Sequence, residues 1–240
     1  KELLNMELVN IKDLSKTFKG KRVLHDINFT IEKGEIYGLV GNNGAGKTTL
    51  LRMICNLLQP TSGRIEFNKE AFSSKIKVGT LIEHPALYFD MTAYKNIKAK
   101  ALALGVNYSK DEIYNLLDMV GLQDTGRKNV HAFSMGMKQR LGIALAFVGR
   151  PDLLVLDEPI NGLDPQGITE VRNLLVKIHN EHNVTMIISS HILDELAKTA
   201  TRFCVISKGR IIKNCTKEQF MEECGDKPID EFYLQIIQNS

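Results

Sequence analysis

The sequence has few cysteines, and none of them stands in a spacing typical of a metal site. The four cysteines among 240 residues form no Cys-x-x-Cys pair, and the six histidines complete no zinc pattern with them. Disulfide-rich miniproteins and zinc-centred domains are therefore excluded. We expect reduced cysteines, packed or idle, in a protein that stays inside the cell. They are Cys55, Cys204, Cys215 and Cys224.

Long apolar runs and a strong net charge are also missing. The longest apolar stretches, such as residues 141–148, reach about half of the roughly 18 residues that a membrane-spanning helix needs. Residues 1–6 lack the basic and apolar pattern of a secretion signal. The net charge of +3 is too small to indicate a nucleic-acid partner, and we interpret basic residues 19–22 as a solvated turn. We expect a soluble protein that could work at a membrane only through another, membrane-spanning chain.

What is present is an ordinary globular composition, with 43% hydrophobic and 25% charged residues. Residues 27–31 alternate between apolar and polar, and residues 36–40 form a short apolar run that enters a glycine-rich loop. Behind the loop, apolar residues repeat at helical spacing from Leu50 to Leu58, and Pro60 is predicted to end that helix. This order of strand, loop and helix predicts an α/β fold with a mainly parallel sheet.

Residues 90–150 differ from the rest because they lack a clear strand and show helical periodicity. Within them, Ser109 and Glu112 form a capping box that begins a helix, and Gly121 ends it. We interpret this segment as a helical insertion. The elements predicted after it are strands at 153–156 and 184–189, helices at 168–178 and from about 192, a hairpin at 203–213, and two short helices at the end.

The strongest chemical signal is the glycine-rich loop at residues 41–48, which fits the pattern G-x-x-x-x-G-K-[ST] between a strand and a helix. Glycine permits close approach of the backbone, so successive N–H groups can surround an anion at a helix N-terminus. Lys47 would contact the β- and γ-phosphates of a nucleotide, Thr48 would ligate Mg²⁺, and Thr49 would reach the α-phosphate. The predicted phosphate-binding residues are Gly41, Asn42, Asn43, Gly44, Ala45, Gly46, Lys47, Thr48 and Thr49.

A second group of polar residues follows the later apolar strands. Asp157 and Glu158 end the first of these strands, at the sheet edge where we expect the phosphate loop. Asp157 would hold Mg²⁺, and Glu158 would polarise the attacking water of a phosphoryl transfer. His191 follows the next strand and would contact the γ-phosphate. A solvated strand end remains the alternative for the carboxylates, and a structural or solvated histidine for His191.

Together these residues resemble the ATP-binding subunit of ABC transporters, over residues 7 to about 215. The discriminating segment is 133–140, Phe-Ser-Met-Gly-Met-Lys-Gln-Arg, which is similar to a divergent form of the family signature Leu-Ser-Gly-Gly-Gln. It stands before a predicted helix, and Ser134 lies 23 residues ahead of Asp157. Ser134 as an ordinary helix N-cap is the alternative interpretation.

The resemblance implies one ABC ATP-binding domain over residues 1–240. Its parts would be a P-loop NTPase core with a mainly parallel sheet and an N-terminal antiparallel β subdomain, a helical subdomain that carries the signature, and a helical tail. The corresponding ranges are about 7–85 and 151–215 for the core, about 86–150 for the helical subdomain, and 216–240 for the tail.

The family also implies a mechanism in which two subunits bind two ATP molecules, with Mg²⁺, head to tail. Ser134, Met135 and Gly136 would then face the ATP of the partner, at a helix N-terminus. Asp164 would line the dimer interface. A homodimer is sufficient, and a heterodimer remains open. The dimer would power a separate transmembrane permease from the cytoplasmic face of the membrane.

Phe18 stands where the family places an aromatic residue that stacks on adenine. The chain has no tryptophan that could serve instead. Ordinary packing of Phe18 in the core is the alternative interpretation.

The sequence departs from the family pattern at three positions. Met135 and Met137 replace a glycine and the glutamine of the signature. Glu83 stands where the family carries a glutamine that senses Mg²⁺, and we expect metal sensing to be retained with altered coupling to the membrane subunit. Glu83 together with residues 134–140 resembles the subgroup that provides bacitracin resistance and lantibiotic immunity.

Two other classes of function are alternatives to a transporter ATPase. A non-transport relative, such as a DNA-repair head or a translation factor, would carry long coiled coils or two cassettes, and neither is found here. A metabolic phosphotransferase with a phosphate loop would work as a monomer with an acceptor pocket, and the signature segment argues against it.

Overall fold

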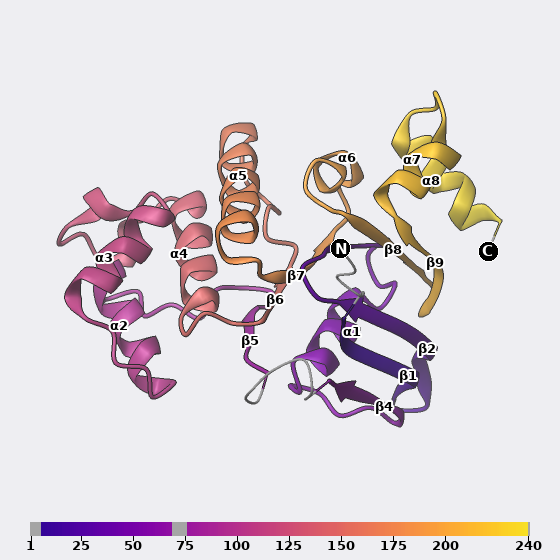
Figure 1. Ribbon diagram of the computed structural model, residues 1–240, viewed down its shortest axis with the longest axis horizontal. Coiled ribbons are helices and arrows are strands. Elements are labelled where there is room, and N and C mark those ends of the chain that lie inside the picture. The colour runs from indigo at the N-terminus through magenta and orange to yellow at the C-terminus, as the bar shows by residue number, and fades with distance from the viewer. Residues whose placement is uncertain (1–5, 69–75, 240) are drawn as a thin grey trace.

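The computed structural model describes residues 6–68 and 76–239, which form two sheets and a set of helices (Figure 1). The smaller sheet is antiparallel and has the strand order β2-β1-β4. Residues 27, 29 and 31 of β2 are buried while their neighbours are more exposed, as the alternating pattern predicted. The strands are β1 (Glu7–Phe18), β2 (Lys21–Glu32) and β4 (Ser62–Phe67). This sheet confirms the expected antiparallel β part of the fold.

The larger sheet has six strands in the order β5-β6-β7-β3-β8-β9. Its first five strands are parallel, and only β9 runs antiparallel to its neighbour β8. Strands β3, β6 and β7 are buried at every position, which explains the apolar runs at residues 36–40, 153–156 and 186–188. The strands are β3 (Ile36–Val40), β5 (Val78–Leu81), β6 (Leu153–Asp157), β7 (Thr185–Ser190), β8 (Arg202–Ser207) and β9 (Arg210–Thr216). The mainly parallel α/β fold is confirmed.

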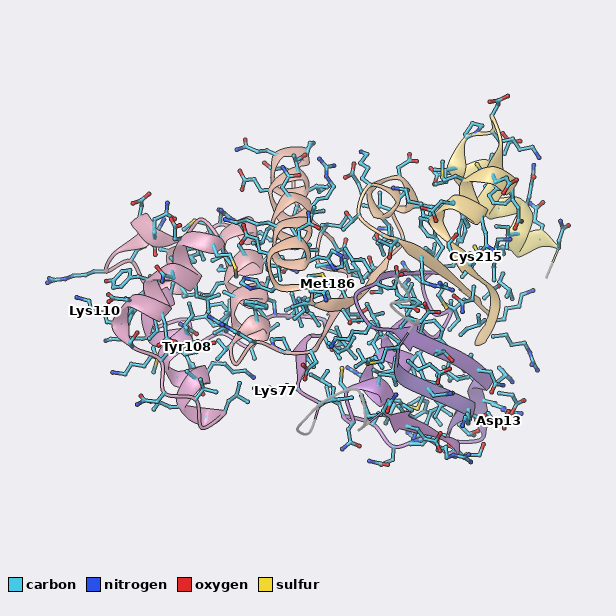
Figure 2. All side chains as sticks on the ribbon, in the orientation of Figure 1. Asp13, Lys77, Tyr108, Lys110, Met186 and Cys215 are labelled. Atoms are coloured by element: carbon cyan, nitrogen blue, oxygen red, sulfur yellow. The ribbon has the colours of Figure 1, made fainter. Side chains whose placement is uncertain are left out.

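Helices of the insertion extend away from the antiparallel sheet. Figure 1 shows them at the far left, with the antiparallel sheet at the lower right. Figure 2 shows Lys110 and Tyr108 in this lobe, Met186 of β7 near the middle, and Asp13 at the opposite end. The capping box of Ser109 and Glu112 is present at the start of α3, as predicted. The helices are α2 (Ala93–Ala103), α3 (Lys110–Met119) and α4 (Met135–Phe147), with short 3-10 turns at Gln123–Thr125 and Val130–Ala132.

The C-terminal helices pack on the hairpin of β8 and β9. The ring of Phe220 lies 4.5 Å from that of Phe203 in β8 and 5.1 Å from that of Phe232, measured between centroids. This aromatic row anchors the tail to the sheet. The remaining helices are α5 (Pro165–His182), α6 (Leu193–Ala197), α7 (Lys217–Cys224) and α8 (Ile229–Gln238).

The helix behind the phosphate loop is shorter than predicted. Helix α1 (Lys47–Ile54) ends well before Pro60. Asn56 adopts the left-handed conformation with φ 56°, and the N–H of Leu57 donates to the carbonyl of Arg52. An asparagine tolerates this conformation, so the turn closes the helix without a glycine. Leu57, which the periodic pattern placed on the helix, is 64% exposed.

All four cysteines are free, as expected, and Cys204, Cys215 and Cys224 are buried. The turn predicted at residues 19–22 is confined to residues 19–20, because residues 21–22 begin β2; all four residues are exposed, as expected.

Candidate functional site

The site lies where the parallel strands end. Strands β6 and β7 pair Asp157 with Ser189, and β3 and β7 pair Val40 with Ser190. The glycine-rich loop follows β3 directly and leads into α1. The carboxyl edge of the sheet therefore brings together the loop and the carboxylates that the sequence placed there.

The glycine-rich loop is shaped by two close approaches. Gly46 has φ 112°, and a Cβ added there would lie 2.5 Å from Cδ2 of Leu24. A Cβ at Gly41 would lie 2.6 Å from the carbonyl oxygen of Ile206. No other residue fits these positions without moving its neighbours. Residues 42–44 are exposed, so the loop presents its backbone to solvent at the N-terminus of α1.

Lys47 is a buried cation inside this loop, with 6% of the residue exposed. Its Nζ donates to the carbonyl oxygen of Gly41 at 2.6 Å and lies 3.2 Å from Oε1 of Glu158. A buried ammonium needs an anionic partner, and in this structure the partner is Glu158. Phosphate oxygens bound in the loop would be a stronger anionic partner for the Lys47 ammonium.

Thr48 and Asp157 form the pair of oxygens that suits a hard cation. The Thr48 hydroxyl donates to Oδ2 of Asp157 at 2.7 Å, and Asp157 is only 3% exposed. Among the described residues no cluster of three His, Cys, Asp or Glu side chains is poised for a metal. Mg²⁺ normally uses one or two protein oxygens and completes its octahedron with water and phosphate oxygens, so this pair fits it.

The thiol of Cys55 lies in the same electrostatic environment. Burial, and secondarily the negative charge of Asp157, raises the pKa of the Cys55 thiol to about 12. The Cys55 side chain is therefore present as the neutral thiol.

Glu158 has an unusual backbone conformation, and its two carboxylate oxygens face different partners. Its φ is 51°, in the left-handed region that non-glycine residues seldom adopt and that often marks functional sites. Oε2 lies 2.8 Å from Nδ1 of His191, while Oε1 is buried without a hydrogen bond beside Lys47. If a phosphate engaged Lys47, Oε1 would become free to accept a proton. His191 thus stands next to Glu158, half exposed toward the open side of the site.

Sequence reasoning missed Ser189, which holds the Asp157 carboxylate and the Glu158 backbone. Its hydroxyl donates to Oδ1 of Asp157 at 2.5 Å and accepts from the backbone N–H of Glu158 at 2.9 Å. The available signal was the pair of serines at the end of an apolar strand, where the fold needs neither.

A contact between the tail and the phosphate loop was also missed. The hydroxyl of Tyr233 in α8 donates to Oδ1 of Asn42 at 3.3 Å. Burial raises the pKa of Tyr233, so the hydroxyl stays protonated and available as a donor. The two residues are 191 positions apart, and no local pattern relates them.

Glu83 lies next to the site but is engaged elsewhere. It follows β5, has φ 62°, and pairs through Oε1 with the guanidinium of Arg52 at 2.7 Å. The predicted metal-site residue Glu83 is therefore held by α1 and not by the Thr48–Asp157 pair.

The signature segment begins helix α4 in the helical lobe. Ser134 is the N-cap, and its hydroxyl accepts from the N–H of Met137 at 3.2 Å, as the alternative interpretation expected. A Cβ at Gly136 would meet open space. Met135 is 55% exposed, and its Cε would lie 2.7 Å from a Cβ at Gly162. The exposed N-terminus of α4 can still receive an anion.

Asp164 and the signature are not brought to this chain's own phosphate loop. Asp164 is the N-cap of α5 and accepts from the N–H of Gly167 at 3.0 Å. Figure 1 shows α4, the helix that the signature begins, well separated from α1. The predicted residues therefore form two separate groups on one chain.

Phe18 lies on the surface, 42% exposed, with Nζ of Lys16 at 5.1 Å from the ring centroid. Ordinary core packing, the alternative for this residue, is wrong. Its ring is available for stacking on a base.

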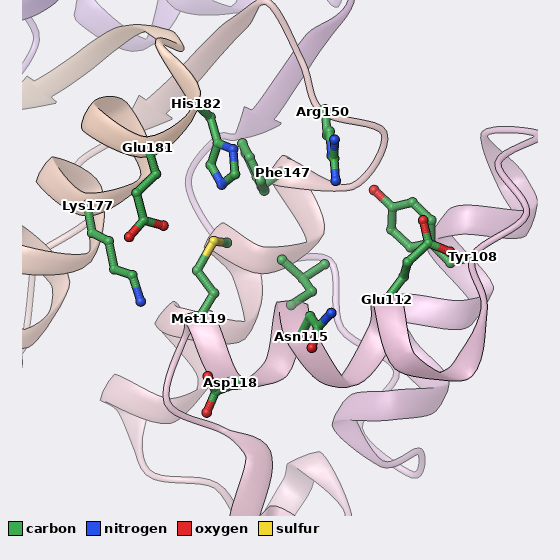
Figure 3. Close-up of a pocket in the computed structure, with 11 residues that line it drawn as sticks. Tyr108, Glu112, Asn115, Asp118, Met119, Phe147, Arg150, Lys177, Glu181 and His182 are labelled. Atoms are coloured by element: carbon green, nitrogen blue, oxygen red, sulfur yellow. The ribbon is translucent and has the colours of Figure 1, made fainter.

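A cavity of about 320 Å³ lies away from these groups. Figure 3 shows Lys177, Glu181 and His182 of α5 facing Met119 of α3 across it. None of its lining residues belongs to the predicted site, and both cationic and anionic side chains line it. The predicted phosphate-binding loop lies instead on an open surface at the sheet edge.

Comparison with known proteins gives a consistent result. A family model described as ABC transporter matches residues 24–161. A bacitracin transport ATP-binding protein of Bacillus licheniformis is 41% identical over 86% of this chain and 69% of its own length. A lantibiotic transport ATP-binding protein of Streptococcus pyogenes is 42% identical over 85% of this chain and 89% of its own.

Solved structures agree with the sequence relatives. One described as the ATP-binding subunit of an ABC transporter superposes with a TM-score of 0.79 at 29% identity, covering 95% of this chain and 99% of that one. A Clostridium perfringens protein described as part of an ABC transporter complex has a TM-score of 0.78 at 30% identity, covering 91% and 92% of the two chains.

Proposed function

We infer the working role of this chain from its family, because it belongs to the ATP-binding proteins of ABC transporters. Members of this family hydrolyse ATP to power transport and work with separate transmembrane components. In the described parts of the chain, no helix has the length and apolar character needed to cross a bilayer. The role proposed is the ATPase of an exporter, peripheral on the cytoplasmic face of the membrane through its permease.

The observation that supports this role most directly is the ion pair between Lys47 and Glu158. The β- and γ-phosphates of ATP replace Glu158 as the partner of Lys47. Backbone N–H groups of residues 42–46 and the N-terminus of α1 hold the remaining phosphate oxygens. Phe18 stacks on the adenine. Binding of ATP therefore also prepares the catalytic carboxylate.

Thr48 and Asp157 would hold Mg²⁺, Asp157 through water. When bound, Mg²⁺ supplies neutralisation of the phosphate charge. Ser189 keeps Asp157 turned toward Thr48 by its hydrogen bond. Mg²⁺ binding would replace the hydrogen bond between Thr48 and Asp157.

Glu158 then acts on the attacking water. Its Oε1 accepts a proton as the water oxygen bonds to the γ-phosphorus and the bond to the bridging oxygen breaks, which leaves ADP and phosphate. His191 holds Oε2 of Glu158 and contacts the γ-phosphate from the open side.

The residues of the signature complete the site only across two copies. Ser134, Met135 and Gly136 stand at an exposed helix N-terminus, on a lobe separate from α1. A second copy turned head to tail brings this terminus to the γ-phosphate of the first, with Asp164 at the interface. Both halves are present in one chain, so a homodimer suffices; a heterodimer with a second cassette would use the same surfaces.

The substrate proposed is an antimicrobial peptide of the bacitracin or lantibiotic class. Glu83 and residues 134–140 support this, as do the names of the bacitracin and lantibiotic transport relatives. An ABC ATPase for another substrate is the alternative, and a non-transport ATPase is less favoured because these relatives are transport proteins.

A growth test separates these substrates. Deleting the gene in its source organism is expected to sensitise growth to bacitracin or a lantibiotic, with rescue by the wild-type gene and not by Glu158→Gln. Unchanged growth on every peptide of the panel would reject the peptide substrate and leave the ATPase role in place.

Ser189 provides a further test of the site. Ser189→Ala removes the hydrogen bond to the Asp157 carboxylate and the one from the backbone N–H of Glu158. We expect kcat for ATP hydrolysis to fall about tenfold with KM nearly unchanged. Ser190→Ala is the matched control, because its hydroxyl accepts from the N–H of Ile192 and touches neither carboxylate. Steady-state kinetics of both variants measure this, and equal kcat values for the two would contradict the role of Ser189.

A further inference from the structure

Glu83 occupies a place opposite the catalytic carboxylate. Strands β5 and β6 are parallel and pair Leu81 with Leu156. Two residues further along each strand direction stand Glu83 and Glu158, so both carboxylates emerge at the same sheet edge. Each has a positive φ, 62° and 51° respectively. The edge therefore concentrates negative charge beside the metal pair of Thr48 and Asp157.

Helix α1 supplies one cation to each of these carboxylates. Lys47 at its start lies 3.2 Å from Glu158, and Arg52 in its last turn lies 2.7 Å from Glu83. Arg52 stands four residues after Thr48, so the two side chains share one face of the helix. Arg52 is thus the group that holds Glu83 one helical turn away from the metal pair.

We propose that Arg52 is a positioning residue that keeps the Glu83 carboxylate outside the metal site until Mg²⁺ and nucleotide arrive. The proposal rests on the proposed function, in which Mg²⁺ binds at Thr48 and Asp157, and on the sequence prediction that Glu83 is a metal-site residue. Arg52 contacts Glu83 and is not among the residues proposed to bind the nucleotide or the metal. Its effect is to oppose the move of Glu83 toward Mg²⁺, and so to lower the gain in nucleotide affinity that Mg²⁺ provides.

The ion pair between Arg52 and Glu83 is weak enough to break when Mg²⁺ and nucleotide bind. The side chains of Arg52 and Glu83 are 43% and 55% exposed, and ion pairs this exposed are weak. A divalent cation beside phosphate can therefore draw Glu83 away. A glutamine at position 83 would remain neutral and form no ion pair with Arg52. The proposed role of Arg52 therefore depends on the glutamate that this chain has in place of the family's glutamine.

The test measures binding of a non-hydrolysable fluorescent ATP analogue. Its Kd is determined with Mg²⁺ and with EDTA, and the ratio of the two is the Mg²⁺ gain. Four proteins are compared: wild type, Arg52→Met, Glu83→Gln, and the double variant. We expect Arg52→Met to raise the Mg²⁺ gain about threefold, and to leave it unchanged when Glu83→Gln is also present.

The double variant distinguishes the specific ion pair between Arg52 and Glu83 from the general effect of removing one positive charge. Loss of one positive charge would alter metal affinity in both backgrounds, whereas release of Glu83 acts only when Glu83 is present. Arg64→Met is the matched control, since Arg64 forms a comparably exposed pair with Glu66 at 2.6 Å, away from the site. We expect its Mg²⁺ gain to equal that of the wild type.

Two results would overturn the inference and leave the ATPase role intact. One is an unchanged Mg²⁺ gain in Arg52→Met; the other is an equal rise with and without Glu83→Gln. A wild-type protein that fails to bind the analogue with or without Mg²⁺ would instead reject the proposed nucleotide site itself.

Discussion

Glu158→Gln is expected to bind ATP with nearly wild-type affinity and to hydrolyse it at least ~10²-fold more slowly. The amide retains the shape of the carboxylate and can still contact His191, but it cannot accept the proton of the attacking water. Binding is spared because the phosphates, and not Glu158, are the partners of Lys47 in the ATP complex. Phosphate release and equilibrium ATP binding, measured on the same preparation, test both parts.

Glu181→Gln is a matched control for this variant. Glu181 is an exposed carboxylate on α5, beside the cavity that is remote from the phosphate loop. We expect it to turn over ATP at the wild-type rate. Wild-type turnover in Glu158→Gln would contradict the assignment of Glu158 as the group that receives the proton.

Lys47→Met should lose binding as well as turnover. The variant removes the buried cation that the phosphates would meet, so we expect ATP affinity to fall at least ~10-fold and hydrolysis at least ~10²-fold. It also leaves Oε1 of Glu158 without its cationic partner. Nucleotide titration measures the affinity, and circular dichroism shows whether the variant remains folded.

A second variant keeps this prediction testable. Lys47→Met combined with Glu158→Gln removes both charges of the pair, so any loss of folding caused by an unpaired carboxylate is relieved while the phosphate contact stays absent. ATP affinity equal to that of Glu158→Gln in the double variant would contradict the role of Lys47.

Much of the fold could be predicted because its signals are local. The buried parallel strands are continuous apolar runs, and the helix starts at Ser109 and Thr216 have capping boxes that the structure contains. The phosphate loop is one contiguous segment, and its place between strand and helix is set by adjacent residues. The end of α1 was missed because Asn56 replaces the glycine that usually marks such a stop.

The contacts that tune the site could not be predicted, because they join distant segments. Arg52 and Glu83 are 31 positions apart, and Ser189 and Asp157 are 32 apart. Their approach depends on strand order and helix packing that no single window of sequence contains. The same holds for Tyr233 and Asn42. The sequence could therefore predict which residue types lie at the carboxyl edge of the sheet, but not which residues they contact.

The signature shows a further limit of residue patterns. Ser134 satisfies the ordinary requirements of an N-cap within its own chain. Its proposed contact with the phosphates of a second copy comes from the resemblance to ABC transporter subunits, and the separation of α4 from α1 is compatible with it.

The most direct test of head-to-tail ATP binding is the molar mass of Glu158→Gln in solution, measured by light scattering with and without ATP and Mg²⁺. We predict the monomer mass without nucleotide and twice that mass with ATP, with the doubling abolished by the additional change Ser134→Glu, which places a carboxylate against the phosphates of the partner. A monomer mass with ATP bound, or a dimer that still forms with Ser134→Glu, would contradict the head-to-tail dimer with ATP at its interface.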